Sequence, residues 1–177
     1  MQIKNSTTHF GIVTIILHWI IALLIIGLLV LGLYMVSLPW NPQRLKFYGW
    51  HKEYGLLVLF LAIFRIIWRL SNEQPELALP WLEKIAARSM HWAFYVFMFA
   101  MPITGWLITS AAGLPASFFG LFTLPNLIAP DESNRVLFQW IHEWLGYALI
   151  AAICMHTAAA LKHHFINKDD ILRRMFP

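Results

Sequence analysis

Two histidines in one apolar segment have a spacing that suits chemistry at two separate sites. His142 and His156 lie fourteen residues apart within segment 139–164. At about 100° per residue, this spacing is close to four helical turns, so both imidazoles would leave the same helix face. At about 1.5 Å per residue, they would be roughly 21 Å apart along the axis, comparable with much of a bilayer's hydrocarbon thickness. One helix would therefore present two histidines at two membrane depths.

Two further histidines match these depths. His18 lies about two turns inside the first apolar segment, and His51 lies near the start of the second. If successive segments cross in opposite directions, His18 shares its depth with His156, and His51 shares its depth with His142. Two neutral imidazoles that face each other across a helix bundle form a natural axial pair for haem iron, and the large apolar ring suits a bundle interior. We predict these two pairs.

Other interpretations of the histidines remain open. A single membrane histidine is more often a packing residue or an interfacial anchor than a metal ligand. Zinc is the rival metal, but its tetrahedral site needs a third or fourth ligand of the Cys, His or carboxylate type. Glu53 and Glu143 lie near only one pair. His91, His163 and His164 could complete the other, although their positions at helix ends suit water and lipid headgroups better. The alternative of another class is a non-redox metal-binding or transport bundle.

The composition indicates a membrane protein. Hydrophobic residues make up 59% of the 177 residues and charged residues 12%, which a soluble domain of this size cannot accommodate. We predict an all-α membrane protein with one domain, residues 1–177, built as an up-and-down bundle of four transmembrane helices. The predicted spans are about 11–36, 48–70, 86–112 and 136–164. The basic residues lie at segment ends and form no patch, so no nucleic acid partner is expected.

The basic residues also predict the orientation. Nine lysines and arginines fall on the side of the two termini and four on the other side. Basic loops stay in the cytoplasm, so both termini should be cytoplasmic. The nine are Lys4, Arg65, Arg69, Lys84, Arg88, Lys162, Lys168, Arg173 and Arg174, and the four are Arg44, Lys46, Lys52 and Arg135.

Small and basic residues accompany the histidines. Gly55 follows His51 by one turn and Gly146 follows His142 by one turn, which would leave room for a flat ring beside each imidazole. Arg65 lies fourteen residues after His51 on the same helix face. It either pairs with an acidic group of a bound cofactor or extends to lipid phosphate.

Several motifs resemble those of bacterial cytochrome b561. They are His18-Trp19, the H-x-x-x-G from His51 to Gly55, the H-E-x-x-G from His142 to Gly146, and the closing MHTAAALKHHFINKDD of residues 155–170. The resemblance spans essentially the whole chain, and the wider group includes the haem-bearing membrane subunits of nickel hydrogenases and formate dehydrogenases. It implies two non-covalent b-type haems, an electron path across the bilayer and exchange with quinone. The one cysteine, Cys154, lies in no C-x-x-C-H motif for covalent haem attachment.

The resemblance also assigns roles to residues. It carries the axial ligands over as His18 with His156 on the cytoplasmic side and His51 with His142 on the periplasmic side. It gives His91 a non-ligand place beside a haem or quinone. Further expected roles are propionate neutralisation by Arg65 and Lys52, and proton handling near a quinone by His91, His163, His164 and Asp169.

The predicted function is membrane electron transfer through two b-type haems, with quinone as redox partner, in a multi-pass protein of the bacterial inner membrane. Superoxide:quinone oxidoreductase is one activity that the resemblance implies, with superoxide or a redox protein as the other partner. The alternative is a haem-bearing anchor and electron-transfer subunit for another dehydrogenase or a periplasmic protein. The sequence identifies no catalytic residue, and a homodimer is compatible with it.

Overall fold

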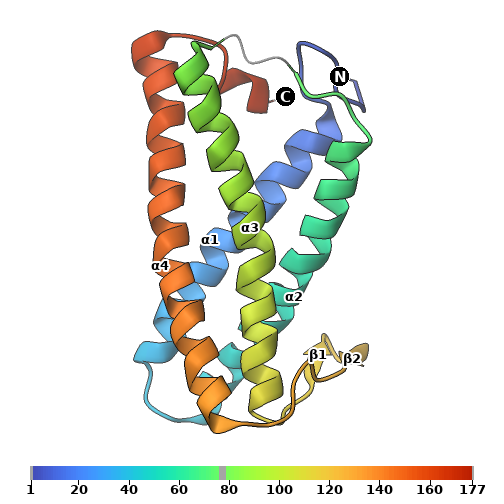
Figure 1. Cartoon of the computed structure of the whole chain (residues 1–177), viewed down its shortest axis with the longest axis vertical. Coiled ribbons are helices and arrows are strands. Elements are labelled where there is room, and N and C mark those ends of the chain that lie inside the picture. The colour runs from blue at the N-terminus through green and yellow to red at the C-terminus, as the bar shows by residue number, and fades with distance from the viewer. Residues whose placement is uncertain (1, 76–78, 177) are drawn as a thin grey trace.

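The computed structural model describes residues 2–75 and 79–176. In this part of the chain, four long helices run alternately in opposite directions (Figure 1). They are α1 (Ile12–Ser37), α2 (Pro42–Leu70), α3 (Trp81–Ala111) and α4 (Glu132–Lys162). The predicted helical architecture is therefore present.

Helices α2 and α4 begin before the predicted spans, because capping residues precede their apolar stretches. The Asn41 side chain accepts a hydrogen bond of 2.7 Å from the Arg44 N–H, and Pro42 takes the first helical position, where a missing N–H costs nothing. The Asp131 side chain accepts a 2.7 Å bond from the Asn134 N–H in the same way at α4. The spans predicted to start near 48 and 136 followed the apolar residues alone, whereas the helices begin in the polar ends before them.

Three helices in the described residues are long and apolar enough to cross a membrane: α1, α3, and α4 together with the turn that extends it to Asn167. The apolar stretch of α2 is bordered by Lys52 and Glu53 at one end and by Arg65 and Arg69 at the other. The structure therefore supports three of the four predicted spans, and the crossing by α2 stays a prediction.

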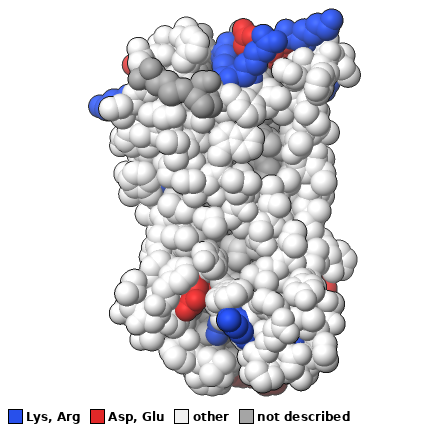
Figure 2. All heavy atoms as spheres, turned by 180° about the vertical axis from the view of Figure 1, so that it is seen from behind, with Lys and Arg blue, Asp and Glu red and all other residues white. Residues whose placement is uncertain are grey.

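The outside of the bundle is apolar. Leu23, Val30 and Trp92 are about two-thirds exposed, at 66%, 64% and 59%. On the face shown in Figure 2, charged side chains gather towards the two ends, with an uncharged band between them. Apolar surface on this scale is stable in lipid rather than in water.

Helix packing leaves α4 attached on one side only. Close contacts join α1 to α2, α2 to α3, and α3 to α4, whereas within the described residues α4 does not pack closely against α1 or α2. A buried cluster ties the first three helices together through Ile21 of α1, Ala62 of α2, and Tyr95 and Met98 of α3. The backbone of α4 thus stands away from α1 and α2, where it can meet them only through side chains.

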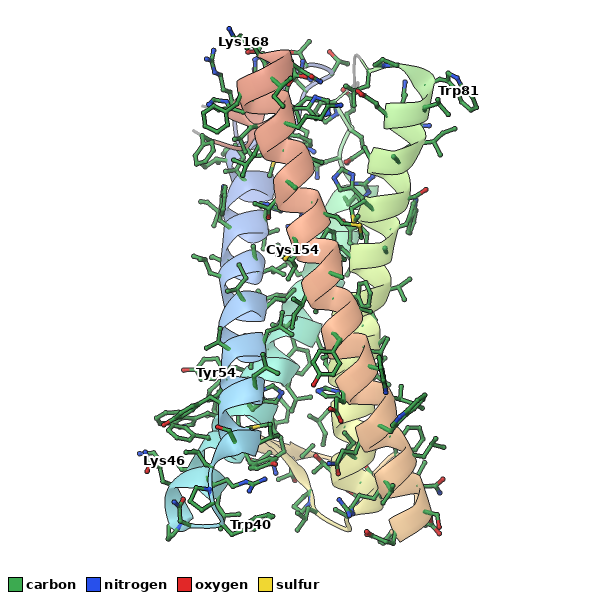
Figure 3. The ribbon with its side chains drawn as sticks, turned by 90° about the vertical axis from the view of Figure 1, so that its left-hand side faces the viewer. Trp40, Lys46, Tyr54, Trp81, Cys154 and Lys168 are labelled. Atoms are coloured by element: carbon green, nitrogen blue, oxygen red, sulfur yellow. The ribbon has the colours of Figure 1, made fainter. Side chains whose placement is uncertain are left out.

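The two ends of the bundle differ. Both termini lie at one end, here called the terminus end (Figure 1), where Figure 3 shows Trp81 and Lys168. The opposite end, here called the hairpin end, carries Trp40 and Lys46. Placement of both termini at one end fits the predicted topology. Which end faces the cytoplasm stays a prediction.

The connection between α3 and α4 contains a short antiparallel hairpin. Strand β1 (Ala116–Phe118) pairs with β2 (Phe122–Leu124), with Ala116 opposite Leu124. Phe118 packs edge-on against Phe60 of α2, with ring centroids 5.1 Å apart. The hairpin therefore rests on α2 and covers part of the hairpin end.

Candidate functional site

The histidine pair at the terminus end joins α1 to α4. The ring centroids of His18 and His156 lie 6.4 Å apart, with ring planes at 56°. Phe94 of α3 meets the His156 ring edge-on at 5.2 Å. His91, also of α3, lies on another side of the same ring, with centroids 6.2 Å apart. The structure thus brings His18 and His156 together and places His91 beside them.

The pair at the hairpin end joins α2 to α4. The ring centroids of His51 and His142 lie 6.1 Å apart, with planes at 75°. Thr104 of α3 places its hydroxyl 2.9 Å from His142 Nδ1. His51 Nδ1 is buried and has no hydrogen-bond partner among the described residues. A buried nitrogen without a partner is costly unless another group satisfies it.

Both separations fit an iron atom between the rings. A histidine nitrogen binds a metal at about 2.0–2.1 Å, and the ring centre lies about 1.1 Å further away, so two opposed ligands have centroids about 6.3 Å apart. The two pairs measure 6.4 and 6.1 Å. Each pair joins α4 to a helix, α1 or α2, against which its backbone does not pack closely. The residues present therefore fit two axially ligated haems.

The sequence profile described as prokaryotic cytochrome b561 matches residues 9–177. The chain belongs to this family. It is 34% identical over 185 residues to cytochrome b561 homolog 2 of Escherichia coli K12, covering 99% of this chain and 95% of the relative. It is 33% identical over 178 residues to cytochrome b561 homolog 1 of the same organism, covering 95% and 97%. It is 27% identical over 189 residues to a protein of Yersinia pestis named probable superoxide oxidase CybB, covering 100% and 98%.

Membership establishes the broad character of the molecule. Proteins of the cytochrome b561 family are integral inner-membrane proteins that bind b-type haem and transfer electrons, and the three apolar helices agree with this placement. The predicted family and membrane class are therefore confirmed.

Arg65 of α2 lies beside the terminus-end pair of this cytochrome. Its Nη2 is 3.4 Å from His18 Nδ1. The sequence left open whether this guanidinium meets a cofactor or extends to lipid phosphate. Its place inside the bundle next to a candidate ligand favours contact with a cofactor, because a buried cation needs a nearby acceptor.

The other predicted cofactor-binding residues lie at the hairpin end. Lys52 is half-buried on α2, next to His51. A Cβ at Gly55 would meet no described atom within 4 Å, and one at Gly146 would meet only Met101, at 3.9 Å. Both glycines therefore leave space beside their histidines.

Zinc lacks its usual ligand set here. Across residues 2–75 and 79–176, no three His, Cys, Asp or Glu side chains form a group able to hold a metal ion. Glu53 and Glu143, the carboxylates near the hairpin-end histidine pair in sequence, therefore do not complete a metal-binding group with it. A haem iron takes only two ligands from the protein, so a pair of histidines would suffice to hold it.

His163 has a different environment from the one its sequence position indicated. It is 9% exposed, and its Nδ1 lies 2.6 Å from the Asp169 carboxylate, so the expectation that it faces water and headgroups is wrong. Burial raises the pKa of Asp169, but hydrogen bonds from His163 and from the Ile171 N–H bring it below its ordinary value. His163 Nε2 is 3.9 Å from Glu83 of α3, so these groups tie the terminal turn η1 (His163–Asn167) to the bundle.

Two neighbours of the hairpin-end pair were not predicted. Thr104 contacts His142, and a Cβ at Gly32 of α1 would lie 3.2 Å from His51 Cε1. The available signal for Thr104 was a hydroxyl within an apolar span, where polar groups seek partners. Gly32 gave no signal, because its role depends on how closely α1 packs against α2 at His51, which the sequence does not show.

Proposed function

We propose that this chain is a di-haem cytochrome that transfers electrons across the membrane. His18 and His156 would hold one haem, and His51 and His142 the other. The observation that carries the proposal is that both pairs show the separation expected for an intervening iron, on α4 positions about 21 Å apart along its axis. The positive-inside rule supports a cytoplasmic terminus end and a periplasmic hairpin end.

Each haem supplies reversible one-electron chemistry, and the protein supplies ligation, spacing and insulation. The histidines fix the two positions. Phe94 against His156 and the buried cluster around Tyr95 exclude water between α1, α2 and α3. Arg65 at the terminus end and Lys52 at the hairpin end would neutralise propionates, because each is a cation next to one of the histidine pairs.

We propose quinone as one redox partner, taken up from the membrane at the terminus end. A shallow apolar groove of about 350 Å³ lies between α3 and α4, and its volume falls in the range of small-molecule sites. Met90 and Met155 line it, and they directly adjoin His91 and His156 in sequence. A quinone ring in this groove would therefore lie at the depth of the terminus-end pair. Its walls also include Ala86, Ala93, Ala148 and Ala152.

Superoxide is the proposed donor at the hairpin end. The Yersinia pestis relative is named a probable superoxide oxidase. Lys46 and Lys52 lie at this end, and cations there would attract a small anion towards the His51–His142 pair. One-electron oxidation of superoxide to dioxygen would deliver one electron per event, and two such electrons with two protons reduce a quinone to a quinol.

The test is turnover by the isolated chain. Purified protein in detergent or liposomes is mixed with a superoxide source and a soluble quinone, and quinol formation is followed optically. We expect haem reduction followed by quinol formation that depends on the chain. Haem reduction without any quinone turnover, together with copurification of a larger redox subunit, would identify an anchor subunit instead. A colourless purified protein would contradict redox function altogether.

A further inference from the structure

A buried hydroxyl from α3 contacts one of the proposed ligands. Thr104 is 9% exposed, and its Oγ1 lies 2.9 Å from His142 Nδ1. The same oxygen lies 2.8 Å from the Ala100 carbonyl and 2.9 Å from the Met101 carbonyl. Three polar atoms thus surround a single hydroxyl inside the bundle.

The Thr104 hydroxyl has a single hydrogen and can donate one hydrogen bond. Carbonyl oxygens only accept, and a helical threonine hydroxyl usually donates to the carbonyl one turn back, so the two short contacts assign the Thr104 O–H to Ala100 or Met101. The Met101 carbonyl also accepts a hydrogen bond from His142, which requires a proton on the ring nitrogen that faces α3. The hydroxyl oxygen is then left as an acceptor towards His142. For that contact to be a hydrogen bond, Nδ1 of His142 must carry the proton and donate it. The neutral ring with a proton on Nδ1 has a bare Nε2, which is the form that binds a metal through Nε2.

We propose that Thr104 is a positioning residue that fixes the tautomer and the orientation of His142 for haem ligation. The inference rests on the proposed haem ligation by His142 and goes beyond it in assigning the control of this ligand to a hydroxyl on α3. The next residue, Gly105, also faces the ring, since a Cβ there would lie 3.5 Å from His142 Cε1, in ordinary van der Waals contact.

His51, the proposed ligand opposite His142, has no comparable hydrogen bond. His51 Nδ1 has no hydrogen-bond partner among the residues that the structure describes. The hairpin-end pair is therefore unequal, with His142 held by α3 and His51 held by packing alone. An acceptor on the far nitrogen of a ligating imidazole makes the ring a stronger electron donor, which favours the ferric over the ferrous state.

The experiment is a redox titration of purified holoprotein carrying Thr104→Val or Thr104→Ser. Valine keeps the shape and removes the hydroxyl, whereas serine keeps the hydroxyl. Loss of the acceptor should favour ferrous haem about tenfold at one of the two haems, which is a rise of about 59 mV in a one-electron midpoint potential. Serine should leave that potential near the wild-type value. The matched control is Thr109→Val, because Thr109 is also buried on α3 but its hydroxyl donates to the Gly105 carbonyl.

The other haem serves as an internal reference for folding. Loss of one haem in Thr104→Val with its retention in Thr104→Ser also supports a positioning role. Unchanged potentials in Thr104→Val, or an equal shift in Thr104→Ser or Thr109→Val, would overturn the proposal. If wild-type protein carried no haem, the proposed function would fail separately. The ¹⁵N NMR shifts of His142 in wild-type and Thr104→Val chains would then still decide whether the hydroxyl sets the tautomer.

Discussion

Gly32 offers a sharp test of how tightly the hairpin-end site is built. A Cβ at this position would lie 3.2 Å from His51 Cε1 and 3.8 Å from His51 Nδ1. Carbon atoms pack best at about 3.5–4.0 Å, so Gly32→Ala must push the imidazole away by at least about 0.3 Å. Metal–ligand distances at well-formed sites lie within about 0.2 Å of their usual values. Because the displacement exceeds this spread, we expect haem affinity at this site to fall about tenfold, or about 1.4 kcal/mol.

Gly27→Ala is the matched control. Gly27 lies in the same helix, and a Cβ there would meet no described atom within 4 Å. Both changes gain the same helix propensity, so only the contact with His51 differs between them. Haem transfer to apomyoglobin, followed optically, measures the affinity of each variant. The reasoning would be refuted if Gly32→Ala released its haem no faster than Gly27→Ala.

Three further changes test other parts of the protein. Arg65→Gln should lower one haem midpoint potential by about 59 mV, a tenfold change in ferric preference, because a cation near the iron disfavours the ferric state, whereas Arg65→Lys should stay close to wild type. Ala152→Phe should fill the groove between α3 and α4 and raise the KM for quinone about tenfold in the turnover assay, whereas Phe at the neighbouring exposed Ala151 should not. The lowered pKa of Asp169 means that its bond to His163 stabilises the terminal turn fully above the unfolded pKa of about 3.9 and is lost as pH falls through the lower folded value. The protection of amides in residues 163–171, measured relative to their intrinsic exchange rates, should therefore fall only at acidic pH, and a turn equally protected in Asp169→Asn at neutral pH would contradict this role.

The two histidine pairs could be predicted because helical geometry converts sequence spacing into positions in space. Fourteen residues return to the same face, which placed His142 and His156 on one stripe of α4 before any contact was known. Alternating helix direction then matched their depths with those of His51 and His18. Both inferences use only the number of residues per helical turn and the rise per residue.

The surroundings of the ligands depend on tertiary packing, which spacing does not encode. Thr104 acts on His142 because α3 packs along α4, and Gly32 matters because α1 crosses α2 next to His51. The burial of His163 depends on a chain reversal that brings Asp169 back onto it. The helix starts at Pro42 and Glu132 were missed because capping residues are polar and fall outside an apolar pattern.

The separation of α4 from α1 and α2 was also beyond prediction. Apolar periodicity shows which helix face is inside, but it does not show the distance between helices. Ring separations of 6.4 and 6.1 Å are set by that distance. Together with the matched depths of the helix positions, they make these two histidine pairs candidate iron sites.

A haem count on three purified proteins tests the central proposal most directly. The wild-type chain should carry two haems that titrate separately, and His142→Ala and His156→Ala should each carry one. Because the two positions lie about 21 Å apart on α4, each variant should lose one haem and keep the spectrum and potential of the other. Two haems with unaltered spectra in either variant would show that the pairing of His18 with His156 and of His51 with His142 is wrong.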